Sequence, residues 1–255
     1  MEFKRSVDKK NIPTCNIMGV NIAAINMEWL LNYIQDNLSD IKGDYICVSN
    51  VHTTVISYED ACYCSIQNNG LMAIPDGGPL STIGKKRGYM EMERTTGPSL
   101  MGEIFKISAK KGYRHYFFGS TEETLRALQK KVIEHYPEIQ IVGTYSPPFH
   151  EISEEENRNI VEKINETKPD FVWIGLGAPK QEIWMAEHQG IVKGLMIGVG
   201  AGFDYYAENI KRAPKWMQKN NLEWVYRLIQ DPKRLLKRYL ITNTKFIWNA
   251  FIRRR

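Results

Sequence analysis

The segment that decides the fold runs from Arg114 to Tyr136 and reads RHYFFGSTEETLRALQKKVIEHY. Its first five residues form a β-prone run, which Gly119 stops. Ser120 and Glu123 then fit a capping box at the start of a helix. Apolar side chains recur at helical spacing from Glu122 onward, and those predicted to face inward are Leu125, Leu128, Val132, Ile133 and Tyr136. The segment therefore predicts a β-strand that passes through a short turn into an amphipathic helix.

The same pattern recurs along the chain. A second amphipathic helix is predicted over Glu154–Glu166, with Ile160, Val161 and Ile164 facing inward. Strands that alternate with amphipathic helices form βαβ crossovers, and apolar strands indicate a sheet covered on both faces. We therefore predict an α/β fold, a Rossmann-like parallel sheet flanked by helices. The other predicted strands are Tyr45–Ser49, Ile139–Val142, Phe171–Ile174 and Leu195–Val199.

The composition is that of an ordinary globular protein of 255 residues, 43% hydrophobic and 25% charged. It excludes disordered chains, collagen and disulfide scaffolds. The first ten residues are too charged for a signal peptide, and no stretch approaches the roughly 20 apolar residues of a membrane-spanning helix. We expect a cytoplasmic protein without a transmembrane anchor. Its cysteines, expected to be reduced, lack the spacing of zinc or redox sites: Cys15, Cys47, Cys62 and Cys64.

The net charge of +5 conceals two parts of opposite sign. Residues 210–255 contain 13 Lys and Arg but only two acidic residues, a net charge of +11. Residues 1–209 contain 21 Lys and Arg against 27 acidic residues, a net charge of −6. We therefore divide the chain into an α/β body, residues 1–209, and a basic helical appendage, residues 210–255.

From Lys233 onward the appendage is predicted to form an amphipathic helix. Its basic residues share one face: Lys233, Arg234, Lys237, Arg238 and Lys245. Its apolar residues share the other: Leu235, Leu236, Tyr239, Leu240, Phe246, Ile247 and Phe251. Such a helix is typical of a segment that binds a membrane surface, a partner or nucleic acid, or one that packs on the body with a solvated basic face. The apolar face also allows self-association into a homo-oligomer.

Glycine-containing turns follow three predicted strands, at the sheet edge where such folds bind anionic ligands. The turns begin at Gly119, at Gly175 (GLGAPKQE) and at Gly198 (GVGAGFD). Their glycines let backbone N–H groups approach a phosphate, and Lys180 and Gln181 can donate to a phosphate or a sugar hydroxyl. Alternatively, the glycines serve only tight strand-to-helix turns. Asp204 either accepts from hydroxyls or caps the next helix.

Other polar residues fit either a structural or a chemical role. Asp76, in the turn IPDGGP, is either an Asx-turn residue or a general base toward a hydroxyl nucleophile. Arg94 has acidic neighbours and fits a surface ion pair, and Asn50 follows the first predicted strand. No Asp-x-Asp and no ligand spacing among the histidines is present to hold a metal–diphosphate, so we expect no metal and no cofactor.

Together these motifs resemble those of the WecG/TagA/CpsF bacterial glycosyltransferases, glycosyltransferase family twenty-six, over about residues 16–240. The resemblance depends on the combination of motifs. They are Pro75–Gly77, Glu93-Arg94 with Gly97, Gly119, Ile141–Gly143, Gly175–Glu182, Gly198–Gly200, Phe203-Asp204, Lys211–Pro214, Leu222–Trp224 and Tyr226–Leu228.

The resemblance implies an inverting transferase that moves an N-acetylmannosamine-type or glucose-type sugar from a UDP donor to a saccharide on a polyprenyl diphosphate. Members build capsule, exopolysaccharide or the teichoic acid linkage, and this implies a peripheral enzyme on the inner face of the cell membrane. Asp76 is the implied base, and Arg94 and Gln181 are implied to contact the donor sugar. Arg227, Arg234 and Lys237 are implied to bind the acceptor diphosphate. Further residues predicted at the substrates are Asn50, Gly119, Gly177, Lys180, Glu182, Gly200, Asp204 and Arg212.

The chain departs from the family pattern at three places. Val48 stands where TagA-like members have threonine, so either the adjacent Ser49 takes over that contact or the donor sugar differs. Lys237 replaces the third appendage arginine, with Arg238 as a substitute. Asn209 follows Glu208 where many members have glycine, and we expect it to adopt the left-handed conformation.

Two other classes of protein share parts of this pattern. A dinucleotide-binding oxidoreductase needs G-x-G-x-x-G after its first strand and an acidic residue about 20 residues later, and the chain has neither. A nucleic-acid-binding module would use the basic tail, with binding that falls steeply as salt rises. We expect a transferase that does not bind nucleic acid.

Overall fold

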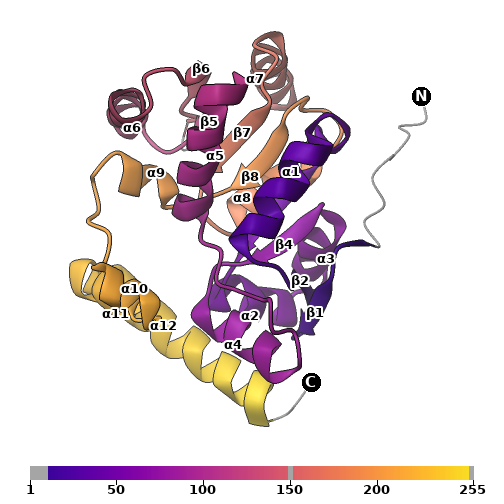
Figure 1. Cartoon of the computed structure of the whole chain (residues 1–255), viewed down its shortest axis with the longest axis vertical. Coiled ribbons are helices and arrows are strands. Elements are labelled where there is room, and N and C mark those ends of the chain that lie inside the picture. Colours follow the sequence, from indigo (N-terminus) through magenta and orange to yellow (C-terminus); the bar gives the residue numbers. More distant parts are fainter. Residues whose placement is uncertain (1–10, 149–151, 253–255) are drawn as a thin grey trace.

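The computed structural model describes residues 11–148 and 152–252. Eight strands there form one sheet in the order β1-β2-β4-β3-β8-β7-β5-β6. β1 is antiparallel to β2, and all other neighbours are parallel. The predicted α/β fold with a largely parallel sheet is therefore confirmed (Figure 1). The strands are β1 (Thr14–Ile17), β2 (Val20–Ala23), β3 (Tyr45–Ser49), β4 (Met72–Pro75), β5 (Arg114–Gly119), β6 (Gln140–Tyr145), β7 (Phe171–Gly175) and β8 (Leu195–Gly198).

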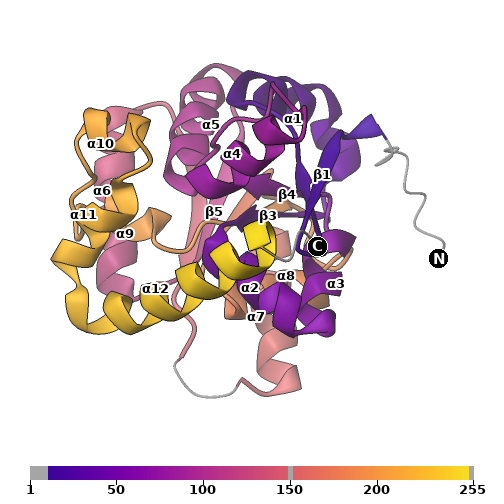
Figure 2. The same cartoon turned by 90° about the horizontal axis from the view of Figure 1, so that it is seen from below.

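Helices cover both faces of the sheet, as the apolar strands predict. α1, α5 and α6 pack on one face, and α2, α3, α7 and α8 pack on the other; Figure 2 shows α1 and α5 on the opposite side of the sheet from α3 and α8. The helices are α1 (Met27–Ile41), α2 (Val51–Glu59), α3 (Ala61–Asn69), α4 (Gly78–Lys86), α5 (Gly97–Lys111), α6 (Glu122–His135), α7 (Glu154–Glu166), α8 (Lys180–Glu187), α9 (Gly202–Tyr206), α10 (Lys215–Lys219), α11 (Glu223–Gln230) and α12 (Pro232–Ile247), followed by the π-helical turn η2 (Trp248–Ile252).

The central strands form the middle of the core. β3, β4 and β8 are buried along their whole length, because helices on both faces remove them from water. β3 and α7 have the bounds predicted for them, and the three residues expected to face inward from α7 are buried.

Two details of the β5–α6 connection differ from the prediction. The N-cap of α6 is Thr121, whose hydroxyl accepts from the Thr124 N–H, while Ser120 adopts a left-handed backbone with φ of 58°. The N-cap of α6 therefore lies one residue later in the chain than the predicted capping box places it. On α6, Ile133 is 48% exposed and does not face inward.

The linker between α9 and α10, residues 207–214, contains the boundary between the acidic body and the basic appendage. The left-handed residue there is Glu208, with φ of 61°, and not Asn209 as predicted. The Asn209 amide instead donates to the Thr124 hydroxyl (3.0 Å) and the Asp204 carboxylate (3.3 Å). These hydrogen bonds fix the end of the body, directly before the appendage begins, against α6 and α9.

α12 does not divide into one basic and one apolar face. Leu235 and Phe246 are buried at 1% and 2% exposure, and α12 packs on α2. Leu236 and Leu240 remain 49% and 62% exposed. The helix therefore buries one apolar stripe and exposes another. The side chain of Phe251, predicted on the apolar face, lies outside the described residues.

None of the described helices combines the length and the apolar character needed to cross a membrane. The charged first ten residues lie outside the described part of the chain.

Candidate active site

A cleft of about 840 Å³ lies at the carboxyl edge of the sheet, where β4, β3, β8 and β7 end. Asn50 follows β3, Asp76 follows β4, and glycine turns follow β7 and β8. α11 and α12 border the cleft from the appendage, and Figure 2 shows α12 running past α2. The predicted residues that line it are Asn50, Asp76, Arg94, Gly177, Gln181, Gly200, Arg227, Arg234 and Arg238.

Asp76 is a half-buried carboxyl group on the turn between β4 and α4. Its N–H donates to the Ser49 carbonyl (2.8 Å), which fixes the turn against β3. Burial raises the pKa of Asp76 to about 6; Glu223 adds to the rise, while Arg94, Arg227 and a hydrogen bond from Asn50 oppose it. The carboxyl is thus ionised at neutral pH and more basic than an ordinary aspartate.

Asn50 joins the carboxyl end of β3 to α2. Its Oδ1 accepts from the N–H groups of His52 and Thr53 (3.0 and 3.2 Å) as the helix N-cap. The amide nitrogen is thereby directed toward the Asp76 carboxylate. Asn50 therefore orients Asp76 as well as starting α2.

Val48 and Ser49 point to opposite sides of β3, because side chains alternate along a strand. Val48 lines the cleft. The Ser49 hydroxyl is buried and donates to Gln67 Oε1 (2.5 Å). Ser49 is thus placed away from the cleft, behind α3.

Gln181 reaches the cleft from the first turn of α8. It is 4% exposed, and its Nε2 donates to Glu182 Oε1 (2.7 Å). Its Oε1 is buried and has no hydrogen-bond partner among the described residues. Glu182 is fully buried, and burial raises its pKa. Glu182 therefore lies behind the cleft and holds the Gln181 amide, which leaves one acceptor of Gln181 available to a ligand.

Three arginines of the appendage line the cleft: Arg227, Arg234 and Arg238. Arg227 Cζ lies 5.8 Å from the centroid of the Tyr205 ring. Arg234 pairs with Asp231 (2.6 Å), but no carboxylate of the described residues is within ion-pair distance of Arg227 or Arg238. Burial and the neighbouring arginines lower the pKa of Arg238. Clustered cations without carboxylate partners favour an anionic ligand.

The structure favours Arg238 over Lys237 as the third cleft cation. Arg238 lines the cleft and its Nε is buried without a hydrogen-bond partner among the described residues, whereas Lys237 is exposed outside it. The two residues differ by one position, or about 100° of rotation around the helix.

Several other predicted residues also lie outside the cleft lining. Lys180 is exposed on α8, and Asp204 lies inside α9, whose N-cap is Ala201, so it does not cap that helix. Arg212 donates to the hydroxyl of Ser99 (2.8 Å). Ligand contacts by these residues, and by Ser49, Gly119, Glu182 and Lys237, remain predictions.

The backbone geometry at position 119 explains why a glycine is needed there. The φ of Gly119 is 120°, and a Cβ there would lie 2.6 Å from the backbone carbon of Gly175 on the paired strand β7. We expect Gly119→Ala to lower the free energy of unfolding by about 2–4 kcal/mol, through backbone strain and the clash. Gly88→Ala is the control, because Gly88 also has positive φ (94°) but open space around it; we expect about 1–2 kcal/mol there. Urea denaturation measures both, and equal losses would argue against the close-approach explanation.

Some residues that line the cleft were not predicted from the sequence to contact a substrate. They include His52, Tyr205, Glu223, Trp224 and Tyr239. His52 Nδ1 is buried without a hydrogen-bond partner among the described residues, and burial lowers its pKa. The motif Leu222–Trp224 was a signal for Glu223, but only the folded chain shows what this carboxylate contacts.

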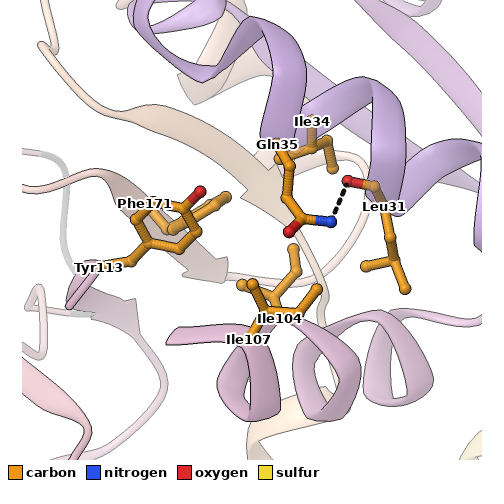
Figure 3. A pocket seen from close by; sticks show the side chains of 7 residues that line it. All are labelled: Leu31, Ile34, Gln35, Ile104, Ile107, Tyr113 and Phe171. Carbon is orange, nitrogen blue, oxygen red and sulfur yellow. Dashed lines mark hydrogen bonds between the residues drawn. The ribbon is translucent and has the colours of Figure 1, made fainter. Parts of the chain in front are cut away.

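The remaining candidates add no second site. Among the described residues, no group of three or more His, Cys, Asp or Glu side chains is placed to hold a metal ion. An apolar recess between α1 and α5 lies near Phe171, at the amino end of β7, and has no room for a water molecule (Figure 3). One polar side chain of its lining, Gln35, donates to the Leu31 carbonyl (3.1 Å). This recess is at the opposite end of β7 from the cleft.

A carboxylate beside a cationic cleft at the carboxyl edge of a parallel sheet is the arrangement expected of an enzyme that acts on anionic substrates. The family model described as "Glycosyl transferase WecG/TagA/CpsF family" matches residues 15–255. The chain belongs to this family and is a glycosyltransferase.

The chain is similar along most of its length to curated members of the family. It is 29% identical to the N-acetylglucosaminyldiphosphoundecaprenol N-acetyl-beta-D-mannosaminyltransferase of Bacillus subtilis (strain 168), over 86% of this chain and 87% of that protein. It is 26% identical to the protein of the same name from Staphylococcus aureus (strain MW2), over 89% of each chain.

Proposed function

We propose that this glycosyltransferase moves an N-acetylmannosamine-type or glucose-type sugar from a UDP donor to a saccharide linked to a polyprenyl diphosphate, with inversion at the anomeric carbon. The observation that carries the proposal is the half-buried Asp76 carboxyl facing a cleft in which two appendage arginines, Arg227 and Arg238, have no carboxylate of the described residues within ion-pair distance. The names of the two bacterial relatives support a diphosphoundecaprenol-linked acceptor. The product would enter cell-surface polysaccharide biosynthesis.

Asp76 is the proposed general base. It takes the proton of the acceptor hydroxyl as that oxygen bonds to the anomeric carbon. The bond from this carbon to the UDP phosphate oxygen breaks on the opposite side, and UDP leaves with the electron pair. A pKa of about 6 suits this step, since the base is ionised at neutral pH yet accepts a proton more readily than an ordinary aspartate.

In this mechanism, groups of the protein stabilise the charge of the two diphosphates. Arg227 and Arg238 face the cleft from the appendage, and the glycine turns after β7 and β8 line it. We assign the appendage arginines to the acceptor diphosphate and Arg94 with Gln181 to the donor. No step of this mechanism uses a metal or a cofactor.

The environment of β3 bears on the choice of donor. Val48 lines the cleft while Ser49 is hydrogen-bonded to Gln67 on the other side of the strand. This arrangement favours a donor sugar that differs at the position facing Val48 over a replacement contact from Ser49.

The experiment that tests the proposal is turnover with purified enzyme. UDP-N-acetylmannosamine, UDP-N-acetylglucosamine and UDP-glucose are each supplied with a detergent-dispersed polyprenyl-diphosphate N-acetylglucosamine acceptor, and the product is identified by mass. We expect one donor to give UDP release and a disaccharide lipid. Absence of turnover with every UDP-sugar would contradict the proposal.

We also propose that the enzyme is a peripheral protein on the inner leaflet of the cell membrane. The exposed stripe of α12, made by Leu236, Leu240 and Ile247, is 49%, 62% and 55% exposed. Lys233 and Lys237 are also exposed on this helix. Apolar side chains next to lysines suit an anionic bilayer surface.

We expect the double variant Leu236→Ser/Leu240→Ser to reduce binding to phosphatidylglycerol vesicles by about tenfold or more, because two apolar insertions are lost. Vesicle sedimentation measures the binding. The control variant Ile133→Ser removes a similarly exposed side chain from α6 and should leave vesicle binding unchanged. If the double variant changed only the mass seen by light scattering, the stripe would instead be a contact between copies of this chain.

A further inference from the structure

One ion pair joins the body to the appendage inside the cleft. Arg94 Nη2 lies 2.5 Å from Glu223 Oε2, and the two side chains are 21% and 9% exposed. The same guanidinium donates through Nε to the Asp76 carbonyl (2.9 Å) and through Nη1 to the Gln218 carbonyl (3.4 Å). A single side chain of the body therefore binds both the turn that carries Asp76 and the appendage segment around α11.

Glu223 has a second cationic neighbour. Arg212 Nε lies 3.7 Å from Glu223 Oε1, and Arg212 Nη2 donates to the hydroxyls of Ser99 (2.8 Å) and Thr96 (3.3 Å) at the start of α5. A buried carboxylate held between two arginines is weak evidence for stability, because its desolvation offsets the attraction. Its position beside Asp76 indicates a role in the reaction.

We infer that Glu223 is a positioning residue of the active site: it holds the Arg94 guanidinium against the Asp76 turn when the appendage borders the cleft, and its negative charge tunes the base. The inference rests on the proposed role of Asp76. It makes the appendage part of the catalytic electrostatics as well as the cover of the cleft.

The charge effect has a definite sign. The groups that face Asp76 are Arg94, Arg227, Asn50, Tyr205 and Glu223, and of these Glu223 raises its pKa while both arginines and Asn50 lower it. Removing the Glu223 charge leaves Arg94 less neutralised as well. Both consequences lower the pKa of Asp76.

A second ion pair between body and appendage provides a matched control. Lys245 Nζ lies 2.5 Å from Glu59 Oε1, but these side chains are 45% and 50% exposed and neither lines the cleft. Exposed pairs contribute little to stability. Glu59→Gln therefore removes the same type of charge from the same interface without touching Asp76.

The experiment compares the full-length wild type, Glu223→Gln, Glu223→Asp and Glu59→Gln by the pH dependence of kcat/KM. We expect Glu223→Gln to move the acidic limb to lower pH and to lower kcat/KM at neutral pH about tenfold, because the neutral amide orients the Arg94 guanidinium less firmly while the Nε hydrogen bond to the Asp76 carbonyl keeps Arg94 at the turn. Glu223→Asp keeps the charge and should keep the limb, with a partial loss of kcat/KM. Glu59→Gln should match the wild type. An acidic limb that is present but unmoved in Glu223→Gln would overturn the inference.

Hydrogen exchange gives a readout that does not depend on catalysis. We expect faster exchange of the backbone amides of residues 215–230 in Glu223→Gln and no change in Glu59→Gln. Unchanged exchange in Glu223→Gln would contradict the positioning role. If the wild-type limb were absent, or persisted in Asp76→Asn, the role of Asp76 itself would fail, and the exchange result would still decide whether Glu223 holds the appendage.

Discussion

Asp76→Asn is expected to lower kcat by about 10²–10⁴-fold, because the acceptor hydroxyl loses its base. Asparagine keeps the size of the side chain and can still hydrogen-bond Asn50, so donor binding should be retained. UDP release measures the rate, and thermal stabilisation by UDP measures binding. Asp36→Asn, on the exposed side of α1, is the control and should behave as wild type.

The same variant should be more stable than the wild type at pH 7.5. The fold raises the pKa of Asp76 from 3.8 to about 6, mainly by burial, so its contribution to stability is complete below pH 3.8 and is lost as pH rises through 6. Asparagine carries no charge at any pH, and we expect a gain of up to about 3 kcal/mol at pH 7.5 and little gain at pH 4. An inactive Asp76→Asn that is also less stable at pH 7.5 would point to misfolding, and full activity would exclude Asp76 as the base.

The second large effect is expected from the appendage cations. Arg227→Ala/Arg238→Ala should lower kcat/KM for the lipid acceptor by about 10²–10³-fold, because two charge-assisted contacts to a diphosphate are lost within a partly desolvated cleft. The single variant Arg238→Ala should cost more than Lys237→Ala, since only Arg238 lines the cleft. Kinetics at constant donor and varied acceptor measure these effects. A greater loss in Lys237→Ala would contradict the placement of α12.

The local parts of the fold could be predicted from sequence because their signals are periodic and short in range. The bounds of α7 follow from its helical apolar period and its Ser153 cap. By contrast, β1, β2 and β4, of four residues each, were not predicted; β8 is equally short, but it ends at the glycine turn that marks it in the sequence. The pairing of β3 with β8 depends on packing between segments about 150 residues apart, which no local pattern specifies.

The site could be predicted only in part, for the same reason. Asp76, Asn50 and Gln181 come together because each follows a strand of one parallel sheet. The contact between Arg94 and Glu223 spans 129 residues and appears only when the appendage packs on the body. The choice between Lys237 and Arg238 depends on the rotation of α12, and because apolar residues lie on both sides of that helix, its sequence alone does not say which side is buried.

The most direct test of the central claim, that Asp76 is the base of a sugar transfer, is the pH dependence of kcat/KM in the wild type and in Asp76→Asn. We predict that wild-type kcat/KM falls tenfold per pH unit below an apparent pKa of about 6, and that the residual activity of Asp76→Asn lacks this acidic limb. A limb that persists unchanged in Asp76→Asn would contradict the account.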